Sequence, residues 1–202
     1  MISVENKYLF LILLILGILF YNIKKYETKN RLCHMGIISK KSNIFYQSTY
    51  LRYKLEKEAL LLIQKNFKCV CKNKNYHFPK ILNYDDNKYK LYLSINGISL
   101  NKYKSFLKLN ITEKIKIKNK EEQINCIIHN LNKCKIKYID LKPANVCINN
   151  KGIISLIDFD LCVINDNPPL RIFSNVEGAY KKYKNYNETD FRKKFINLFK
   201  YY

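Results

Sequence analysis

The longest apolar stretch of the chain lies near its N-terminus. Residues 8–23 contain no charged side chain and are bounded by Lys7 on one side and by Lys24 and Lys25 on the other. The stretch is slightly shorter than the ~20 residues of a typical membrane-spanning helix, so a signal-peptide core and a buried helix are the alternatives. Because no small residues suited to signal cleavage follow it, we predict a retained anchor at 8–23 after a tail at 1–7.

Positive charge is concentrated on the C-terminal side of this stretch. Lys24, Lys25, Lys29 and Arg31 follow it, whereas only Lys7 and the amino terminus precede it. Loops rich in lysine and arginine usually stay on the cytoplasmic side of a membrane. We therefore predict a single-pass membrane protein whose main domain faces the cytosol.

Helical periodicity marks two segments of the main domain. Residues 55–67 place apolar side chains on one face, at Leu55, Ala59, Leu62, Ile63 and Phe67. Residues 121–131 do the same at Ile124, Ile127, Ile128 and Leu131. A weaker pattern predicts a helix over 106–117, with a helix capped by Thr112 as the alternative.

Short apolar runs separated by polar turns predict strands. Residues 78–82 and 90–95 flank the polar turn 85–88, and residues 146–148 and 153–157 flank the turn 149–152. No internal repeat and no Pro- or Ser-rich linker divides the chain. We predict one α+β domain with a hinge after the run at 90–95.

The chain is strongly basic. It has 37 Lys and Arg against 16 Asp and Glu, a formal net charge of +21. Such a charge suits an anionic membrane or nucleic acid, but the abundance of Lys, Asn, Ile and Tyr is also the bias of a genome poor in G and C. Because the lysines are scattered rather than clustered with aromatic residues, we do not expect nucleic acid as a partner.

The seven cysteines indicate a reducing compartment. Their number is odd and they show no repeated metal-ligand spacing. Cys69, Cys71 and His77 form part of a metal-site pattern, but a second cysteine pair is missing. We therefore interpret these thiols as buried, structurally inert side chains.

One stretch carries the residue types of a catalytic site, Asp140-Leu-Lys-Pro-Ala-Asn145, followed further along by Asp158-Phe-Asp160. Asp140 can accept a proton from a hydroxyl group, and Lys142 can neutralise charge on a transferred phosphoryl group. Asn145 and Asp158 supply oxygen ligands of the kind that Mg²⁺ prefers. The pattern predicts a Mg²⁺- and ATP-dependent phosphoryl transfer.

The order and spacing of these residues resemble the protein-kinase pattern H-R-D-L-x-x-x-N followed by D-F-G. The resemblance to the protein-kinase-like superfamily implies an α+β, two-lobed fold. Within it, residues 24–95 would form a reduced N-lobe and residues 96–202 a truncated C-lobe. It also implies ATP and Mg²⁺ as cofactors, with Asp140 and Lys142 as catalytic residues and Asn145 and Asp158 as metal ligands.

The resemblance further implies two nucleotide-site residues in the N-lobe. Glu58 stands where a helical glutamate pairs with the lysine that holds the ATP phosphates, although a solvent-facing acid is an equal interpretation. Lys40 ends the run Ile37-Ile-Ser-Lys40, which is similar to V-A-I-K, but this leaves little chain for two preceding strands. The alternative is a strand at 43–49 with Gln47 in place of the lysine.

Several positions depart from the family pattern. Tyr138 and Ile139 replace the His-Arg pair before the aspartate, and the histidine of that pair normally helps to hold the loop. Asp160 replaces the glycine after Asp-Phe, as in the small-molecule phosphotransferase branch. No G-x-G-x-x-G is present; Gly36 to Ser39 with Ser42 is at most a remnant. Asp190 resembles a buried aspartate that steadies the catalytic loop, or it caps an ordinary helix.

These features predict a membrane-anchored, protein-kinase-like enzyme. We expect it to transfer the γ-phosphoryl group of ATP to a hydroxyl, with protein serine or threonine as the preferred acceptor. The alternatives are a pseudokinase that acts as a binding module and a small-molecule phosphotransferase. The expected partners are ATP and the membrane, and the sequence does not name a protein partner.

Overall fold

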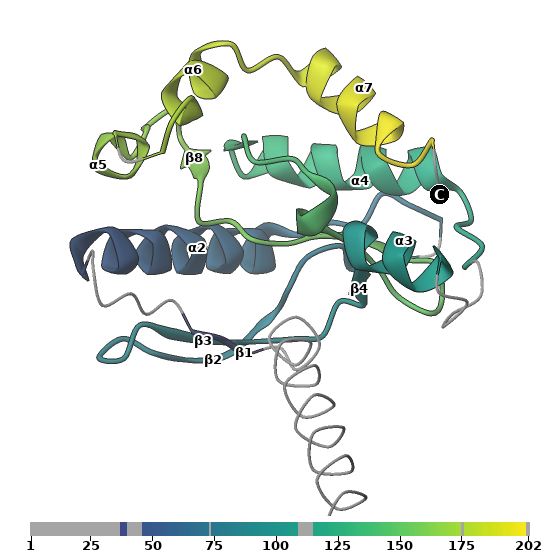
Figure 1. Cartoon of the computed structure of the whole chain (residues 1–202), viewed down its shortest axis with the longest axis horizontal. Coiled ribbons are helices and arrows are strands. Elements are labelled where there is room, and N and C mark those ends of the chain that lie inside the picture. The colour runs from purple at the N-terminus through teal and green to yellow at the C-terminus, as the bar shows by residue number, and fades with distance from the viewer. Residues whose placement is uncertain (1–36, 40–45, 73, 109–114, 175, 201–202) are drawn as a thin grey trace, which may run out of the picture.

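The computed structural model describes residues 37–39, 46–72, 74–108, 115–174 and 176–200. The predicted anchor at 8–23, Lys40 and the candidate glycine-loop remnant at Gly36 and Ser42 lie outside these ranges. Within these ranges, no helix combines the length and apolar character that a membrane crossing requires. The described residues form a mixed fold of helices and antiparallel sheets (Figure 1).

A three-stranded antiparallel sheet and a long helix make up the first part of the fold. The sheet has the order β1-β3-β2, formed by β1 (Ile37–Ser39), β3 (Lys90–Leu93) and β2 (Ile81–Asp85). The predicted turn at 85–88 joins β2 to β3. Helix α2 (Tyr46–Asn66) lies between this sheet and helix α4 (Lys120–Lys133), as Figure 1 shows.

Helix α2 confirms the helix predicted at 55–67 but begins well before it. Because the chain is helical from Tyr46 onward, the alternative strand at 43–49 is wrong for its described residues, and Gln47 lies on the helix. The strand next to β3 is instead β1, whose Ile38 pairs with Leu91. Residues 37–39 of the run that resembles V-A-I-K therefore form one edge strand of the sheet.

The second part of the fold surrounds the catalytic motif. The predicted helix at 121–131 is α4, and the predicted hairpin is β6 (Val146–Ile148) and β7 (Ile154–Leu156). The short strand β4 (Ile98–Ser99) pairs with β6, and β5 (Ile136–Tyr138) pairs with β8 (Cys162–Ile164). Helix α3 (Leu100–Lys108) follows β4. The predicted helix at 106–117 is wrong in its bounds, because residues 115–117 are not helical.

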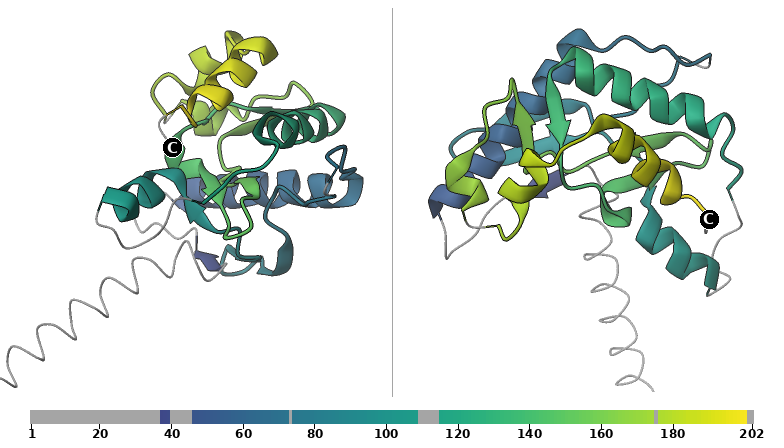
Figure 2. Two further views of the ribbon diagram at one scale, coloured as in Figure 1. Left: turned by 90° about the vertical axis from the view of Figure 1, so that its right-hand side faces the viewer. Right: turned by 90° about the horizontal axis from the view of Figure 1, so that it is seen from above.

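Three helices follow β8, namely α5 (Leu170–Phe173), α6 (Ala179–Lys184) and α7 (Glu188–Asn197). Helix α7 packs against α4, and Figure 2 shows the two helices side by side. The side chain of Asn187 caps α7 by accepting a hydrogen bond from the backbone N–H of Asp190. Asp190 itself is exposed, so the interpretation as a buried, loop-steadying aspartate is wrong.

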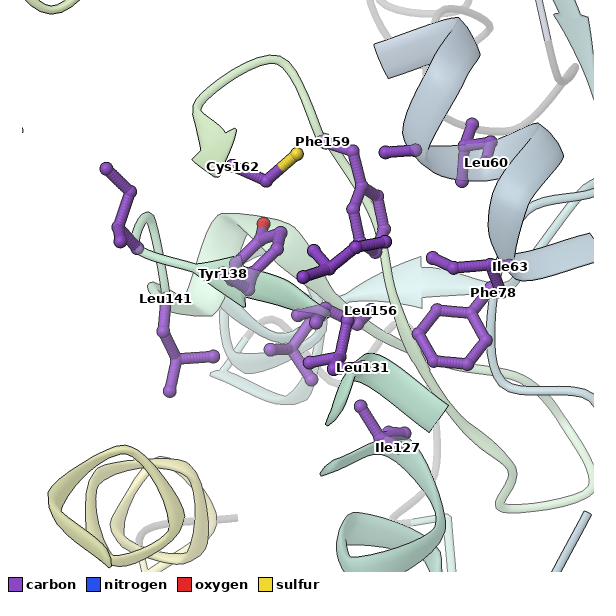
Figure 3. Close-up of a cluster of buried hydrophobic side chains, with 14 of the residues drawn as sticks. Leu60, Ile63, Phe78, Ile127, Leu131, Tyr138, Leu141, Leu156, Phe159 and Cys162 are labelled. Carbon is purple, nitrogen blue, oxygen red and sulfur yellow. The ribbon is translucent and has the colours of Figure 1, made fainter. Parts of the chain in front are cut away.

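One hydrophobic core joins the two parts of the fold. Figure 3 shows the ring of Phe159 between Tyr138 and the α2 side chains of Leu60 and Ile63. Phe159 is fully buried, and its ring centroid lies 5.1 Å from that of Tyr138 and 6.0 Å from that of Phe78. The residues around the catalytic motif are therefore held from both sides by apolar packing.

Gly97, at the predicted hinge, has a conformation and surroundings that exclude a side chain. Its φ is +102°, and a Cβ would overlap the backbone carbonyl of Ile148. Gly178 also has a positive φ, +72°, but no atom lies within 4 Å of its Cβ position. The two glycines thus separate the cost of backbone strain from the cost of steric overlap.

We expect Gly97→Ala to lower the free energy of unfolding by about 2–4 kcal/mol, from backbone strain plus overlap. Gly178→Ala is the matched control and should cost only about 1–2 kcal/mol, because it carries the strain alone. Urea unfolding of both variants checks this. Equal losses would mean that the backbone at Gly97 moves freely away from Ile148.

Candidate active site

The loop between β5 and β6 brings three of the predicted site residues together. Asp140 Oδ2 accepts hydrogen bonds from Lys142 Nζ at 2.5 Å and from Asn145 Nδ2 at 3.0 Å. Pro143 begins the short helix η1 (Pro143–Asn145), which turns Asn145 back toward Asp140. The side chain of Asp140 is mostly buried, at 14% exposure, whereas that of Lys142 is 49% exposed. The carboxylate is thus held by hydrogen bonds beside a more exposed cation.

Asn145 connects this loop to the segment that carries Asp158. Its side chain is buried and donates through Nδ2 to both the carboxylate and the backbone carbonyl of Asp140. Its backbone carbonyl accepts from the N–H of Ile157 at 2.9 Å. Because the amide nitrogen faces Asp140, Oδ1 is the atom of this side chain that suits a hard cation.

Tyr138 makes the second connection between the loop and Asp158. Its hydroxyl donates to the carbonyl oxygens of Ile157 at 2.6 Å and Asp158 at 3.0 Å. The residue takes the position of the histidine in the family pattern, and the structure shows that its hydroxyl binds the next segment of the motif. The substitution at this position therefore leaves the two segments hydrogen-bonded.

The environment of Tyr138 keeps its hydroxyl protonated. Burial raises the pKa of Tyr138 well above its usual value, and the nearby carboxylates of Asp158, Asp140 and Asp160 raise the pKa further. A tyrosine with a raised pKa remains a hydrogen-bond donor throughout the physiological pH range.

Asp158 has a left-handed backbone conformation, with φ +64°. Such a conformation costs a non-glycine residue free energy and persists where neighbouring contacts maintain it. Here the contacts are the Tyr138 hydroxyl on the Asp158 carbonyl and the full burial of Phe159. The backbone at Asp158 is thus set by its surroundings rather than by its own preference.

Helix α2 contacts the Asp158-Phe-Asp160 segment through two charged residues. Glu56 is buried, and its Oε1 accepts from the backbone N–H of Phe159 at 3.3 Å. One turn earlier on α2, Nη1 of Arg52 lies 3.7 Å from Oδ2 of the buried Asp160. Asp160 therefore pairs with α2 in the position where the family pattern has a glycine.

The structure places Glu58 on the other side of α2. Glu58 is exposed and lines a cavity of about 510 Å³ with Lys54, Lys57 and Asp86. Glu56 is therefore the glutamate of α2 that meets the motif, and sequence reasoning missed it. Its position was detectable, because Tyr53, Glu56, Leu60 and Ile63 follow one helical stripe whose other members are apolar.

Lys40 directly follows β1 and lies outside the described residues. Its role in nucleotide binding stays a prediction. Residues 37–39 form a strand next to β3, whereas Gln47 lies on α2.

Comparisons with known proteins are consistent with a kinase-related motif. No protein-family model matches the chain. Over 43 residues, 21% of its length, the chain is 42% identical to the serine/threonine-protein kinase YPK1 of Saccharomyces cerevisiae, and the match covers 6% of that kinase. The activity of the yeast protein is therefore not assigned to this chain by the match alone.

Solved structures of WbdD show a weak likeness. A co-crystal structure of WbdD with the kinase inhibitor LY294002 has a TM-score of 0.46 at 16% identity, covering 80% of this chain and 40% of that chain. A structure of the bifunctional kinase-methyltransferase WbdD has a TM-score of 0.43 at 15% identity. The match covers 80% of this chain and 39% of that chain.

The chemical capacity of the site follows from its donors and acceptors. The carboxylate of Asp140 accepts hydrogen bonds from Lys142 and Asn145 through one oxygen, Oδ2. Lys142 places a cation beside it, and Asn145 with Asp158 offers oxygen ligands from two hydrogen-bonded segments. A base, a cation and a hard-metal donor pair are the parts that phosphoryl transfer to a hydroxyl requires.

Proposed function

We propose that this protein transfers the γ-phosphoryl group of ATP to a hydroxyl group. The observation that carries the proposal is the hydrogen-bonded set of Asp140, Lys142 and Asn145. Two further hydrogen bonds join this set to the segment that carries Asp158, one from the Tyr138 hydroxyl and one to the Asn145 carbonyl. The 42% identity to a serine/threonine kinase over 43 residues supports the same reaction class.

Asp140 acts as the proton acceptor in this proposal. The acceptor hydroxyl gives its proton to the carboxylate as its oxygen forms a bond to phosphorus, and ADP departs with the electrons of the broken P–O bond. Lys142, 2.5 Å from Asp140 Oδ2, offsets negative charge that develops on the transferred group. The mostly buried carboxylate keeps its orientation through its bonds to Lys142 and Asn145.

The donor set fits Mg²⁺ and ATP. Asn145 Oδ1 and the Asp158 carboxylate would hold the metal ion, which prefers few protein oxygens together with phosphate oxygens. MgATP supplies the phosphoryl group and a stable leaving group. Lys40, the next residue of the sequence after β1, would hold the phosphates, with Glu56 rather than the exposed Glu58 as its acidic partner.

Serine or threonine in a protein is the acceptor that we propose first. The two alternatives, a binding module and a small-molecule phosphotransferase, would give different experimental results from a protein kinase. A binding module would bind MgATP, or fail to bind it, without transfer. A small-molecule enzyme would phosphorylate alcohols such as choline or an aminoglycoside but no protein.

We expect saturating MgATP to raise the unfolding midpoint of the full-length chain by roughly 5–10 °C, from about 2.7 kcal/mol of binding linkage at 100 times Kd. Asp158→Ala should remove most of this rise. Asp166→Ala is the matched control, because Asp166 also has a positive φ, +57°, and its side chain is 69% exposed. Both variants place alanine in a strained conformation, and Asp166→Ala also removes an ion pair with Lys137 that lies outside the proposed metal site.

The unfolding midpoints are measured with and without Mg²⁺, at nucleotide concentrations up to several millimolar. A rise in wild type that persists in Asp158→Ala would remove Asp158 from the metal site. No rise in wild type would contradict the proposed enzyme altogether.

A further inference from the structure

A second cluster of reactive side chains lies away from the catalytic motif. Cys69 and Cys71 lie in the connection after α2, His77 lies just before β2, and Cys126 lies on α4. Their ligand atoms all lie within 4.8 Å of one another. Cys71, His77 and Cys126 are buried, whereas Cys69 is partly exposed. Cys126 is the fourth partner that the sequence pattern of Cys69, Cys71 and His77 lacked.

The distances in this cluster suit a single tetrahedral metal ion. The Sγ atom of Cys71 lies 3.4 Å from His77 Nε2, and the Sγ atoms of Cys126 and Cys69 lie 3.8 Å apart. Zn–S and Zn–N bonds of about 2.3 and 2.0 Å give a tetrahedron with edges of about 3.5–3.8 Å. The Sγ atoms of Cys69 and Cys71, 2.7 Å apart, would separate by about 1 Å to admit the ion.

Neighbouring polar groups orient two of the four ligands. His77 Nδ1 lies 2.7 Å from the carbonyl oxygen of Ile154, which places the proton on Nδ1 and leaves Nε2 as a ligand atom. The backbone N–H of Val70 donates to Cys126 Sγ at 3.4 Å. Such outer contacts are typical of ligands that a protein holds ready for a metal.

We propose that Cys69, Cys71, His77 and Cys126 form a structural Zn²⁺ site. Three thiols and one imidazole are a donor set that favours zinc over the oxygen-seeking Mg²⁺ and Ca²⁺. With three thiolates the occupied site carries one net negative charge, and the exposed Lys68, Lys72 and Lys74 lie in the same connection. The three cysteines are free thiols and are available to the metal.

The site would join α2 to α4. The connection after α2 already contacts α4, because Asn130 binds the backbone N–H and carbonyl of Lys68 at 2.8 and 3.0 Å. A metal ion would add bonds from Cys69 and Cys71 to Cys126 and, through His77, reach β7. It would therefore fix the position of α2, which carries Glu56, relative to the helix that leads into the catalytic loop.

The test is the metal content of the full-length chain, purified without chelator and measured by inductively coupled plasma mass spectrometry. We expect about one zinc ion per chain, as four-ligand structural sites bind. Cys126→Ser and Cys71→Ser should retain less than about a tenth of that content. Cys134→Ser, which alters a buried thiol at the end of the same helix outside the cluster, is the matched control and should keep it.

A second measurement on the unaltered sequence covers the case in which a variant fails to fold. Wild-type protein stripped of metal is titrated with Co²⁺, and we expect thiolate-to-cobalt charge transfer with the intense visible bands of tetrahedral coordination. A weak octahedral spectrum would overturn the site. So would zinc-free protein with a Cys69–Cys71 disulfide, or full zinc content in Cys126→Ser.

Discussion

Replacing Asp140 with asparagine is expected to lower the rate of phosphoryl transfer by about 10²- to 10⁴-fold, the usual contribution of a positioned acid or base. The amide oxygen of asparagine can still accept hydrogen bonds from Lys142 and Asn145, which now converge on Asp140 Oδ2. The loop geometry is therefore retained while the proton acceptor is lost. MgATP should stabilise the variant as much as it stabilises wild type.

The measurement is a single-turnover rate of phosphate incorporation, taken beside the MgATP-dependent unfolding midpoint. Asp86→Asn is the control, because Asp86 lies in the exposed turn between β2 and β3 and pairs with Lys57 at 2.7 Å. A wild-type transfer rate in Asp140→Asn would show that another group accepts the proton. A loss of MgATP binding would show instead that the charge of Asp140 acts in the ground state.

The local parts of the site were predictable because short-range geometry determines them. Asp140, Lys142 and Asn145 lie within one loop, so their spacing alone places their side chains near one another, and the structure joins them by hydrogen bonds. The function of Tyr138 was not predictable from spacing. Its hydroxyl binds backbone carbonyls of Ile157 and Asp158, and any residue type can offer a carbonyl.

Helix α2 shows where periodicity misleads. The apolar positions at 55–67 predicted the helix correctly, but its face toward the motif also includes the charged Glu56. The stripe of Tyr53, Glu56, Leu60 and Ile63 places Glu56 on the buried face of α2, but periodicity does not say which distant segment that face meets. The hydrogen bond from Phe159 to Glu56 supplies that information, and it depends on the packing of distant segments.

Fold elements with strong local signals were confirmed, and those without them were not. The hairpin of β6 and β7 and the helix α4 follow from turn residues and an apolar stripe. The bounds predicted as 106–117 were wrong because the helix begins at Leu100, directly after Ser99, a start signal that the apolar periodicity alone does not include. Cys126 likewise joins Cys69 and Cys71 only through the packing of α4 against the connection after α2.

Tyr138→Phe is expected to have the second large effect, on both stability and transfer. The change leaves the ring contact with Phe159 but removes the donor shared by the carbonyls of Ile157 and Asp158. Leaving these groups without that donor should lower the free energy of unfolding by about 1–3 kcal/mol. Tyr53→Phe, which removes a buried tyrosine's hydroxyl bond to Asp86 at 2.6 Å, is the matched control.

The effect on transfer distinguishes a positioning residue from a merely structural one. Asp158 has a left-handed backbone, at φ +64°, that the Tyr138 hydroxyl helps to maintain. A shift of the Asp158 carboxylate by even about 1 Å can cost up to 100-fold in rate, so transfer should fall by about 10- to 100-fold and require more Mg²⁺. Tyr138→His restores a ring N–H donor and should recover part of both losses. If Tyr138→Phe loses stability but keeps the wild-type Mg²⁺ dependence, then Asp158 is positioned by the burial of Phe159 alone.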